Sequence, residues 1–135
     1  MSTHEVEGVK MDMEKLAEQL VNLIATTIVL GTWTDDHLPC YLMRIDLKDG
    51  RSEETQFWWA DPELISAMKY VNESKTARED AIPFIKDSLE SGMEAFNDAS
   101  DMKDIEEITE LGLLKLAGVE EVIETIRINK IANRS

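Results

Sequence analysis

The spacing of hydrophobic residues predicts a helix near the N-terminus of the chain. Residues 1–10 show no sustained period and are expected to form a flexible tail. From residue 11 onward the apolar positions recur every three or four residues, and Asp12 can cap the start of a helix. These positions are Met13, Leu16, Leu20, Leu23 and Ile24. The β-branched run from Thr26 to Val29 fits a strand as well as a helix, so the end of this helix stays open.

The clearest β-strand pattern lies between residues 40 and 60. From Tyr41 to Leu47 every second residue is apolar and belongs to one face, as in a strand with one buried side. Lys48-Asp49-Gly50 then supplies turn residues before a second run that continues to Trp59. A β-hairpin is therefore predicted in the middle of the chain.

Two registers of this hairpin are compatible with the sequence, and the pairing of charges distinguishes them. A two-residue turn at Asp49-Gly50 places Asp46 opposite Glu53, which brings two carboxylates together. A three-residue loop, with Gly50 left-handed in a bulge, places Arg44 opposite Glu54 instead. We expect the second register because it replaces an acid–acid pair with a pair of opposite charges.

The second half of the chain has helical spacing. Asp61-Pro62 combines an N-cap with proline at the first helical position and opens a short helix. A longer helix is expected from about Thr76 toward Phe96, with Pro83 near its start or at a kink. Two more helices are predicted at about 104–117 and 119–131, separated by a glycine.

Together these elements predict an α+β fold. It has an N-terminal helix, a small antiparallel sheet with a central β-hairpin, and a helical C-terminal half. The chain has 135 residues, of which 43% are hydrophobic, enough for one real core but marginal for two. We therefore expect residues 11–135 to form a single domain.

The chain is strongly acidic, with 28 Asp and Glu residues against 14 Lys and Arg residues and a formal net charge of −14. Nucleic-acid phosphates and anionic membranes repel such a chain unless it carries a basic patch, and the sequence shows none. We therefore expect no direct nucleic-acid binding and no membrane binding. Cys40 is the only cysteine, no secretory signal is visible, and the apolar stretch 20–30 is about half of a membrane span. A cytoplasmic location is expected.

Residues with catalytic or metal-binding chemistry are few. His4 lies in the expected tail, which leaves His37 as the one histidine suited to acid–base or metal chemistry. The loop around it also contains Asp35, Asp36 and Cys40. A single loop of this kind lacks the second cluster of ligands that completes a metal site. Nucleophile-elbow, dinucleotide-binding and P-loop motifs are absent. We therefore expect no catalytic residues, no metal and no cofactor, and hence no enzyme.

Acidic residues are concentrated between Asp87 and Glu110. This stretch of 24 residues contains nine carboxylates and one basic residue, Lys103, for a net charge of −8. Five of the carboxylates follow one another at steps of three or four residues, so on a continuous helix they lie along one face. They are Asp87, Glu90, Glu94, Asp98 and Asp101. Acids at this spacing repel each other, so the stripe indicates a face for a basic partner; a merely solvated helix face is the alternative.

The aromatic pair Trp58-Trp59 gives a second indication of a binding surface. Neighbouring residues on a strand point to opposite faces, so only one of the two can face the core. The expected register turns Trp59 inward and Trp58 outward, beside Leu42. We expect a helix to cover Trp58, because the chain has several helices to lay on a small sheet. The alternative is an exposed Trp58 that anchors a partner together with Leu42.

The sequence thus indicates an acidic protein-binding module that occupies the cationic surface of a basic protein. Small acidic chains without catalytic residues are typical of phage anti-defence proteins, nucleic-acid mimics and toxin immunity proteins, a likeness of type rather than of motif. We expect an inhibitor or nucleic-acid mimic whose partner is a nucleic-acid-handling protein. The alternative is a structural or adaptor subunit of an oligomeric complex, including a homo-oligomer.

Overall fold

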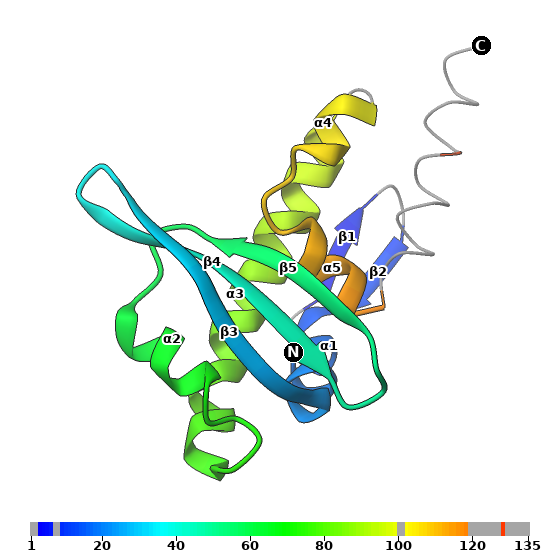
Figure 1. The fold of residues 1–135 in the computed structure, drawn as a ribbon. Helices are drawn as coiled ribbons and strands as arrows, with labels where there is room; N and C mark the ends of the chain where they lie inside the picture. Colours follow the sequence, from blue (N-terminus) through cyan, green and yellow to red (C-terminus); the bar gives the residue numbers. More distant parts are fainter. Residues whose placement is uncertain (1–2, 7–8, 100–101, 119–127, 129–135) are drawn as a thin grey trace.

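The structure, a computed structural model, describes residues 3–6, 9–99, 102–118 and 128. The predicted α+β fold is confirmed, with an N-terminal helix, an antiparallel sheet around a central hairpin and helices in the second half (Figure 1). In chain order the elements are β1 (Thr3–Val6), β2 (Val9–Asp12), α1 (Met13–Leu23), β3 (Ile24–Asp35), β4 (Leu38–Leu47), β5 (Ser52–Phe57), α2 (Pro62–Met68), α3 (Lys75–Asp98), α4 (Met102–Glu106) and α5 (Leu111–Leu116).

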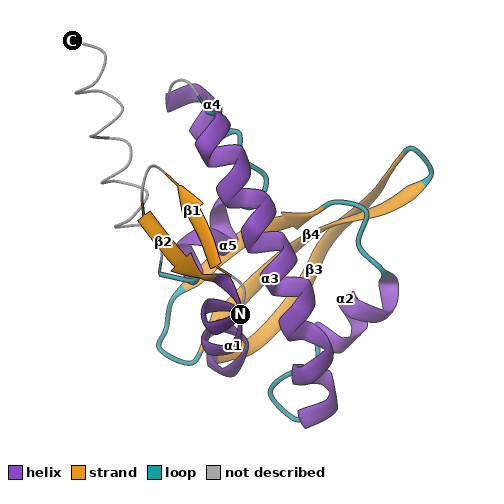
Figure 2. Cartoon of the chain, turned by 180° about the vertical axis from the view of Figure 1, so that it is seen from behind, coloured by secondary structure: helices purple, strands orange, loops and turns teal. Residues whose placement is uncertain are grey.

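Helices cover one face of the main sheet. The strands pair in the order β3-β4-β5, and α1 and α3 lie behind them in Figure 1 and in front of them in Figure 2. Side chains from α1, β4 and α3 meet in one hydrophobic core, which includes Leu20, Met43 and Leu89. Within the described residues, the other face of the sheet carries no helix (Figure 1). We call it the open face.

The N-terminal segment forms a small hairpin where the sequence predicts a flexible tail. β1 and β2 pair antiparallel, with Val6 opposite Val9, and β1 contacts both α1 and α3. The helix that follows begins where predicted, because the Asp12 carboxylate accepts a hydrogen bond from the Lys15 amide at 3.1 Å. It ends at Leu23, and the chain passes directly into β3.

The β-branched run after α1 forms a strand, which decides between the two alternatives of the sequence. β3 pairs antiparallel with β4, and two register shifts interrupt the pairing, one of them between Val29 and Gly31. The strands close in a two-residue turn in which Asp36 and His37 have φ values of 52° and 64°. Two successive positive φ values are typical of a type I′ hairpin turn. The distal part of this hairpin, residues 31–40, projects from the fold in both views, and we call it the arm (Figures 1 and 2).

The register predicted for the β4–β5 hairpin is confirmed. Arg44 lies opposite Glu54, and Asp46 lies opposite Ser52 rather than an acidic residue. Gly50 takes a φ of 93°, a conformation that glycine adopts at little cost. The three-residue loop therefore sets the pairing of the whole hairpin.

The helix cap predicted at Asp61 is formed. Asp61 accepts a hydrogen bond from the Glu63 amide at 2.9 Å at the start of α2. Ser74 caps α3 in the same way, and this helix runs without interruption to Asp98. Pro83 lies inside it, where one backbone hydrogen bond is lost. The predicted long helix is thus confirmed.

The prediction of one helix over residues 104–117 is wrong, because the chain forms two short helices, α4 and α5, instead. Between them the Thr109 carbonyl accepts a hydrogen bond from the Gln56 amide at 3.2 Å. The chain leaves helical geometry to make this contact with the edge of β5. Gly112 then packs directly against the backbone of Glu54.

The helix predicted at 119–131 lies outside the described residues, apart from residue 128. Before it, α5 ends close to Gly118, whose φ of 79° suits a residue that follows a helix C-terminus. Among the described residues, no helix is both long enough and apolar enough to cross a membrane.

Candidate functional site

Four carboxylates of the predicted stripe lie along one side of α3. They are Asp87, Glu90, Glu94 and Asp98. At about 100° per residue they span an arc of roughly 80°, opposite the buried side chains of the helix. Glu90 is half-buried and the other three are exposed. The fifth predicted carboxylate, Asp101, lies outside the described residues. We call the four described residues the acidic face.

Three tryptophans gather where the arm meets the end of β5. The rings of Trp33 and Trp58 meet edge to face with centroids 5.7 Å apart, and those of Trp58 and Trp59 meet likewise at 6.5 Å. Trp58 is 41% exposed and Trp59 is 57% exposed. Two expectations are therefore wrong: Trp59 does not face the core, and Trp58 is flanked by tryptophans rather than covered by a helix.

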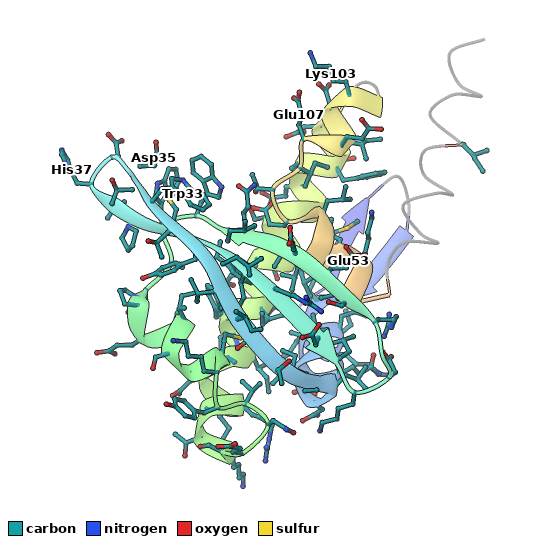
Figure 3. The ribbon with its side chains drawn as sticks, in the orientation of Figure 1. Trp33, Asp35, His37, Glu53, Lys103 and Glu107 are labelled. Carbon is teal, nitrogen blue, oxygen red and sulfur yellow. The ribbon has the colours of Figure 1, made fainter. Side chains whose placement is uncertain are left out.

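The alternation of a strand ends just before this tryptophan pair. β5 ends at Phe57, and Trp59 has a φ of 58°, which is rare for a bulky residue. Such a conformation persists where surrounding contacts fix it. Here the Trp59 indole N–H donates to the Asp35 carboxylate at 3.1 Å, and the Ala60 amide donates to the Pro39 carbonyl at 3.0 Å. Both acceptors belong to the arm, on which Figure 3 marks Asp35.

A pocket of about 330 Å³ opens between the tryptophans and α3. Its aromatic lining residues are Phe57, Trp58, Trp59 and Phe84. Polar side chains also line it, namely Gln56, Asp61, Asp87, Ser88, Ser91 and Glu110. The Ser91 hydroxyl donates to the Glu110 carboxylate at 3.4 Å, which links α3 to the residue before α5. We call this the aromatic pocket; it combines ring surfaces with three carboxylates.

The structure brings some of the predicted binding residues together and separates others. Asp87 and Trp58 line the same pocket. Glu94 and Asp98 continue the acidic face away from it, Asp98 by about 16 Å along the helix axis. Leu42 lies on the open face, half-buried, in a separate groove along the edge of β5.

Sequence reasoning missed Trp59, Phe84 and Glu110 as pocket residues. Phe84 precedes Asp87 by three residues on α3, and this spacing was a usable signal because such residues are neighbours on a helix. Glu110 had no local signal, since the contact between its segment and β5 places it. Assigning β3 as a strand would have placed Trp33 in the row of Cys40, beside the end of β5.

The segment from Asp35 to Cys40 does not gather into a metal site. Asp36 and His37 form the exposed turn at the tip of the arm, where Figure 3 marks His37. Asp35 instead binds the Trp59 indole, and Cys40 is buried. In the part of the chain that the structure describes, no three His, Cys, Asp or Glu side chains lie close enough to hold a metal ion.

The open face carries a carboxylate with a perturbed pKa. The Ser52 hydroxyl donates to the Asp46 carboxylate at 2.6 Å and is the main cause that lowers its pKa. Hydrogen bonds from the Thr26 hydroxyl at 2.9 Å and the Arg44 guanidinium at 3.1 Å lower it further. Asp46 therefore stays ionised at a lower pH than a free aspartate does.

The acidic face and the aromatic pocket carry charge of one sign. Three ion pairs within the described residues lie elsewhere, on β4, in the β4–β5 loop and at the start of α3. Chemically, aromatic rings beside several carboxylates form a surface that attracts cations.

Comparison of the chain with protein-family models, curated proteins and solved structures gives no significant match.

Proposed function

We propose that this chain is an acidic protein-binding module that occupies the cationic surface of a basic protein, as an inhibitor or nucleic-acid mimic does. The observation that carries the proposal is the acidic face of α3, which adjoins a pocket walled by two exposed tryptophans. Carboxylates of one sign attract a basic partner and speed its association. Exposed aromatic rings then supply the apolar contact that slows dissociation.

The acidic face has dimensions that suit a surface built for phosphates. Neighbouring positions at helical steps of three and four residues are about 5–6 Å apart, and the four carboxylates extend over about 16 Å of the helix axis. This spacing approaches the interval between phosphates along one nucleic-acid strand. A protein whose basic groove binds nucleic acid is therefore the partner class that we propose.

The acidic face contributes no side chain to the hydrophobic core. The core packs against the opposite side of α3 through residues such as Ile85, Leu89 and Met93. Acids three or four residues apart repel each other by a few tenths of a kcal/mol per pair, which slightly destabilises the helix. Mixed charges would keep the same surface soluble without this cost. The single sign of charge supports a role in binding.

The test compares two variants with the same net charge. The acidic-face variant combines Glu90→Gln, Glu94→Gln and Asp98→Asn. The control variant removes three exposed carboxylates elsewhere, with Glu14→Gln, Glu18→Gln and Glu73→Gln. Partners are captured from the source cell with wild type and both variants, and association rates are then measured for the captured protein at low and physiological salt.

We expect wild type and the control variant to capture the same basic protein and the acidic-face variant to lose it. The association rate should fall in the acidic-face variant, and the difference should shrink as salt screens the charges. Thermal unfolding should show unchanged or slightly higher stability, because self-repulsion is relieved. Equal capture and equal rates for the two variants would contradict the proposal.

The open face favours a second candidate function, that of a subunit in an oligomer. Ile28, Leu30 and Leu38 are between 46% and 49% exposed, and β3 is an edge strand. Exposed apolar residues on a free edge allow another chain to add to a sheet. Light scattering after size exclusion decides between the candidates: an oligomer that survives high salt favours the subunit, and a monomer favours the acidic binding module.

A further inference from the structure

We infer that the aromatic pocket receives an arginine side chain of the basic partner. This inference rests on the proposed function and names the group that the most specific contact of the module would recognise. Its basis is the combination of ring surface, carboxylates and size in one cavity.

The tryptophan rings are fixed in position and offer their π surfaces to a ligand. The Trp58 indole N–H donates to the Gln56 side chain at 2.9 Å, and the Trp59 indole N–H donates to Asp35 at 3.1 Å. Both polar edges are therefore engaged within the protein. Trp58 is 41% exposed and Trp59 is 57% exposed, and the face of an indole ring attracts cations through its quadrupole.

Two of the three pocket carboxylates are positioned to pair with a cation. Asp61 is engaged in capping α2 through the Glu63 amide. Asp87 is exposed on α3, and the Ser91 hydroxyl holds the half-buried Glu110. A cation in the pocket would thus meet carboxylates from two different parts of the chain.

A guanidinium group satisfies these features better than other ligand groups do. It is planar and always charged, stacks on aromatic rings, and presents five N–H donors that match carboxylates. An anionic group would be repelled, and an apolar side chain would desolvate the carboxylates without pairing them. An ammonium group can pair with a carboxylate but cannot stack as a plane. The volume of about 330 Å³ is at the lower limit for small-molecule pockets, which suits a single side chain.

The probe is N-acetyl-arginine amide, titrated into the ¹⁵N-labelled full chain. The citrulline analogue has nearly the same shape without the charge, and the lysine analogue has the charge without the plane. The indole N–H resonances of Trp58 and Trp59 report occupancy of the pocket. We expect saturable shifts with a dissociation constant on the order of millimolar, because one side chain lacks the rest of an interface. The citrulline and lysine analogues should bind about tenfold and at least about threefold more weakly, respectively.

Single-charge variants locate the binding. Asp87→Asn and Glu110→Gln should each weaken binding of the arginine amide by about threefold to tenfold, as expected for loss of one solvent-accessible hydrogen-bonded ion pair. Asp80→Asn makes the same change of charge on α3 outside both the pocket and the acidic face and should leave the affinity within about twofold. Asp87 is exposed, so its variant should keep the fold, which the remaining amide resonances verify.

Three results would overturn the inference: equal binding of the citrulline analogue, equal binding of the lysine analogue, or equal losses in Asp87→Asn and Asp80→Asn. These results are independent of partner capture. Lost capture by the acidic-face variant without binding of the arginine amide would leave the proposed function standing and overturn the pocket assignment. Binding of the arginine amide with unchanged capture would support the pocket and contradict the role of the acidic face.

Discussion

Replacing Gly112 with alanine should push α5 away from the edge of β5. A methyl group at this position would overlap the carbonyl oxygen of Glu54 and lie 2.9 Å from its carbonyl carbon. Both are backbone atoms, so no side-chain rotation relieves the overlap, and the two segments must separate by at least about 1 Å. This movement also weakens the hydrogen bond from the Gln56 amide to the Thr109 carbonyl.

The expected loss of stability is about 1.5–3.5 kcal/mol. Overpacking costs about 1–3 kcal/mol and the lost hydrogen bond about 1 kcal/mol. The higher helix propensity of alanine offsets about 0.5 kcal/mol of this loss in the free energy of unfolding, because the position is at the start of a short helix. With a urea m value of about 1.5–2 kcal/mol per M, the unfolding midpoint should fall by roughly 1–2 M.

Gly31→Ala is the matched control, because its added methyl group meets no atom within 4 Å. Alanine also restricts the unfolded chain, so this variant should be unchanged or up to about 1 kcal/mol more stable. Hydrogen exchange gives a local readout, since the Gln56 amide should exchange faster in Gly112→Ala alone. Equal urea midpoints for the two variants would refute the close packing of α5 on β5.

Two further substitutions test the core and the open face. Phe96 is fully buried, so Phe96→Ala should cost about 3–5 kcal/mol in urea unfolding, and a loss below about 1 kcal/mol would contradict its place in the core. Ser52→Ala removes the main hydrogen bond that lowers the pKa of Asp46, so this pKa should rise toward the ordinary value of 3.8 in an NMR titration. A lowered folded-state pKa stabilises the protein above the unfolded pKa, and this stabilisation is lost as the pH falls through the folded pKa. Ser52→Ala should therefore be less stable than wild type at pH 7, and this difference in stability should shrink below about pH 4. An unchanged Asp46 titration would contradict the assignment.

Features set by neighbouring residues were predictable from the sequence. The caps at Asp12 and Asp61 and the loop at Gly50 depend only on residues a few positions away. The turn of the arm is equally local but gave no signal, because Asp36 and His37 adopt positive φ values without glycine. The hairpin that contains β3 was therefore not predicted.

Features set by contacts between distant segments were not predictable. The break before α5 exists because Thr109 pairs with β5, and no residue type in the break indicates that the helix is interrupted there. The orientation of Trp59 depends on Asp35, which belongs to another hairpin. The pattern identified Asp87 and Trp58 separately, as part of a charged stripe and an aromatic pair. Only the packing of α3 beside the end of β5 places both on one pocket.

Two hydrogen bonds connect the arm to the Trp59–Ala60 segment. Asp35 and Pro39 belong to the arm, so a displacement of the arm should also displace one wall of the aromatic pocket. A partner that binds both the arm and the pocket would therefore bind cooperatively, because fixing one surface lowers the entropic cost of fixing the other. In protein engineering, substitutions at Asp35 and Trp59 should therefore be chosen together, although the two residues are 24 positions apart in the chain.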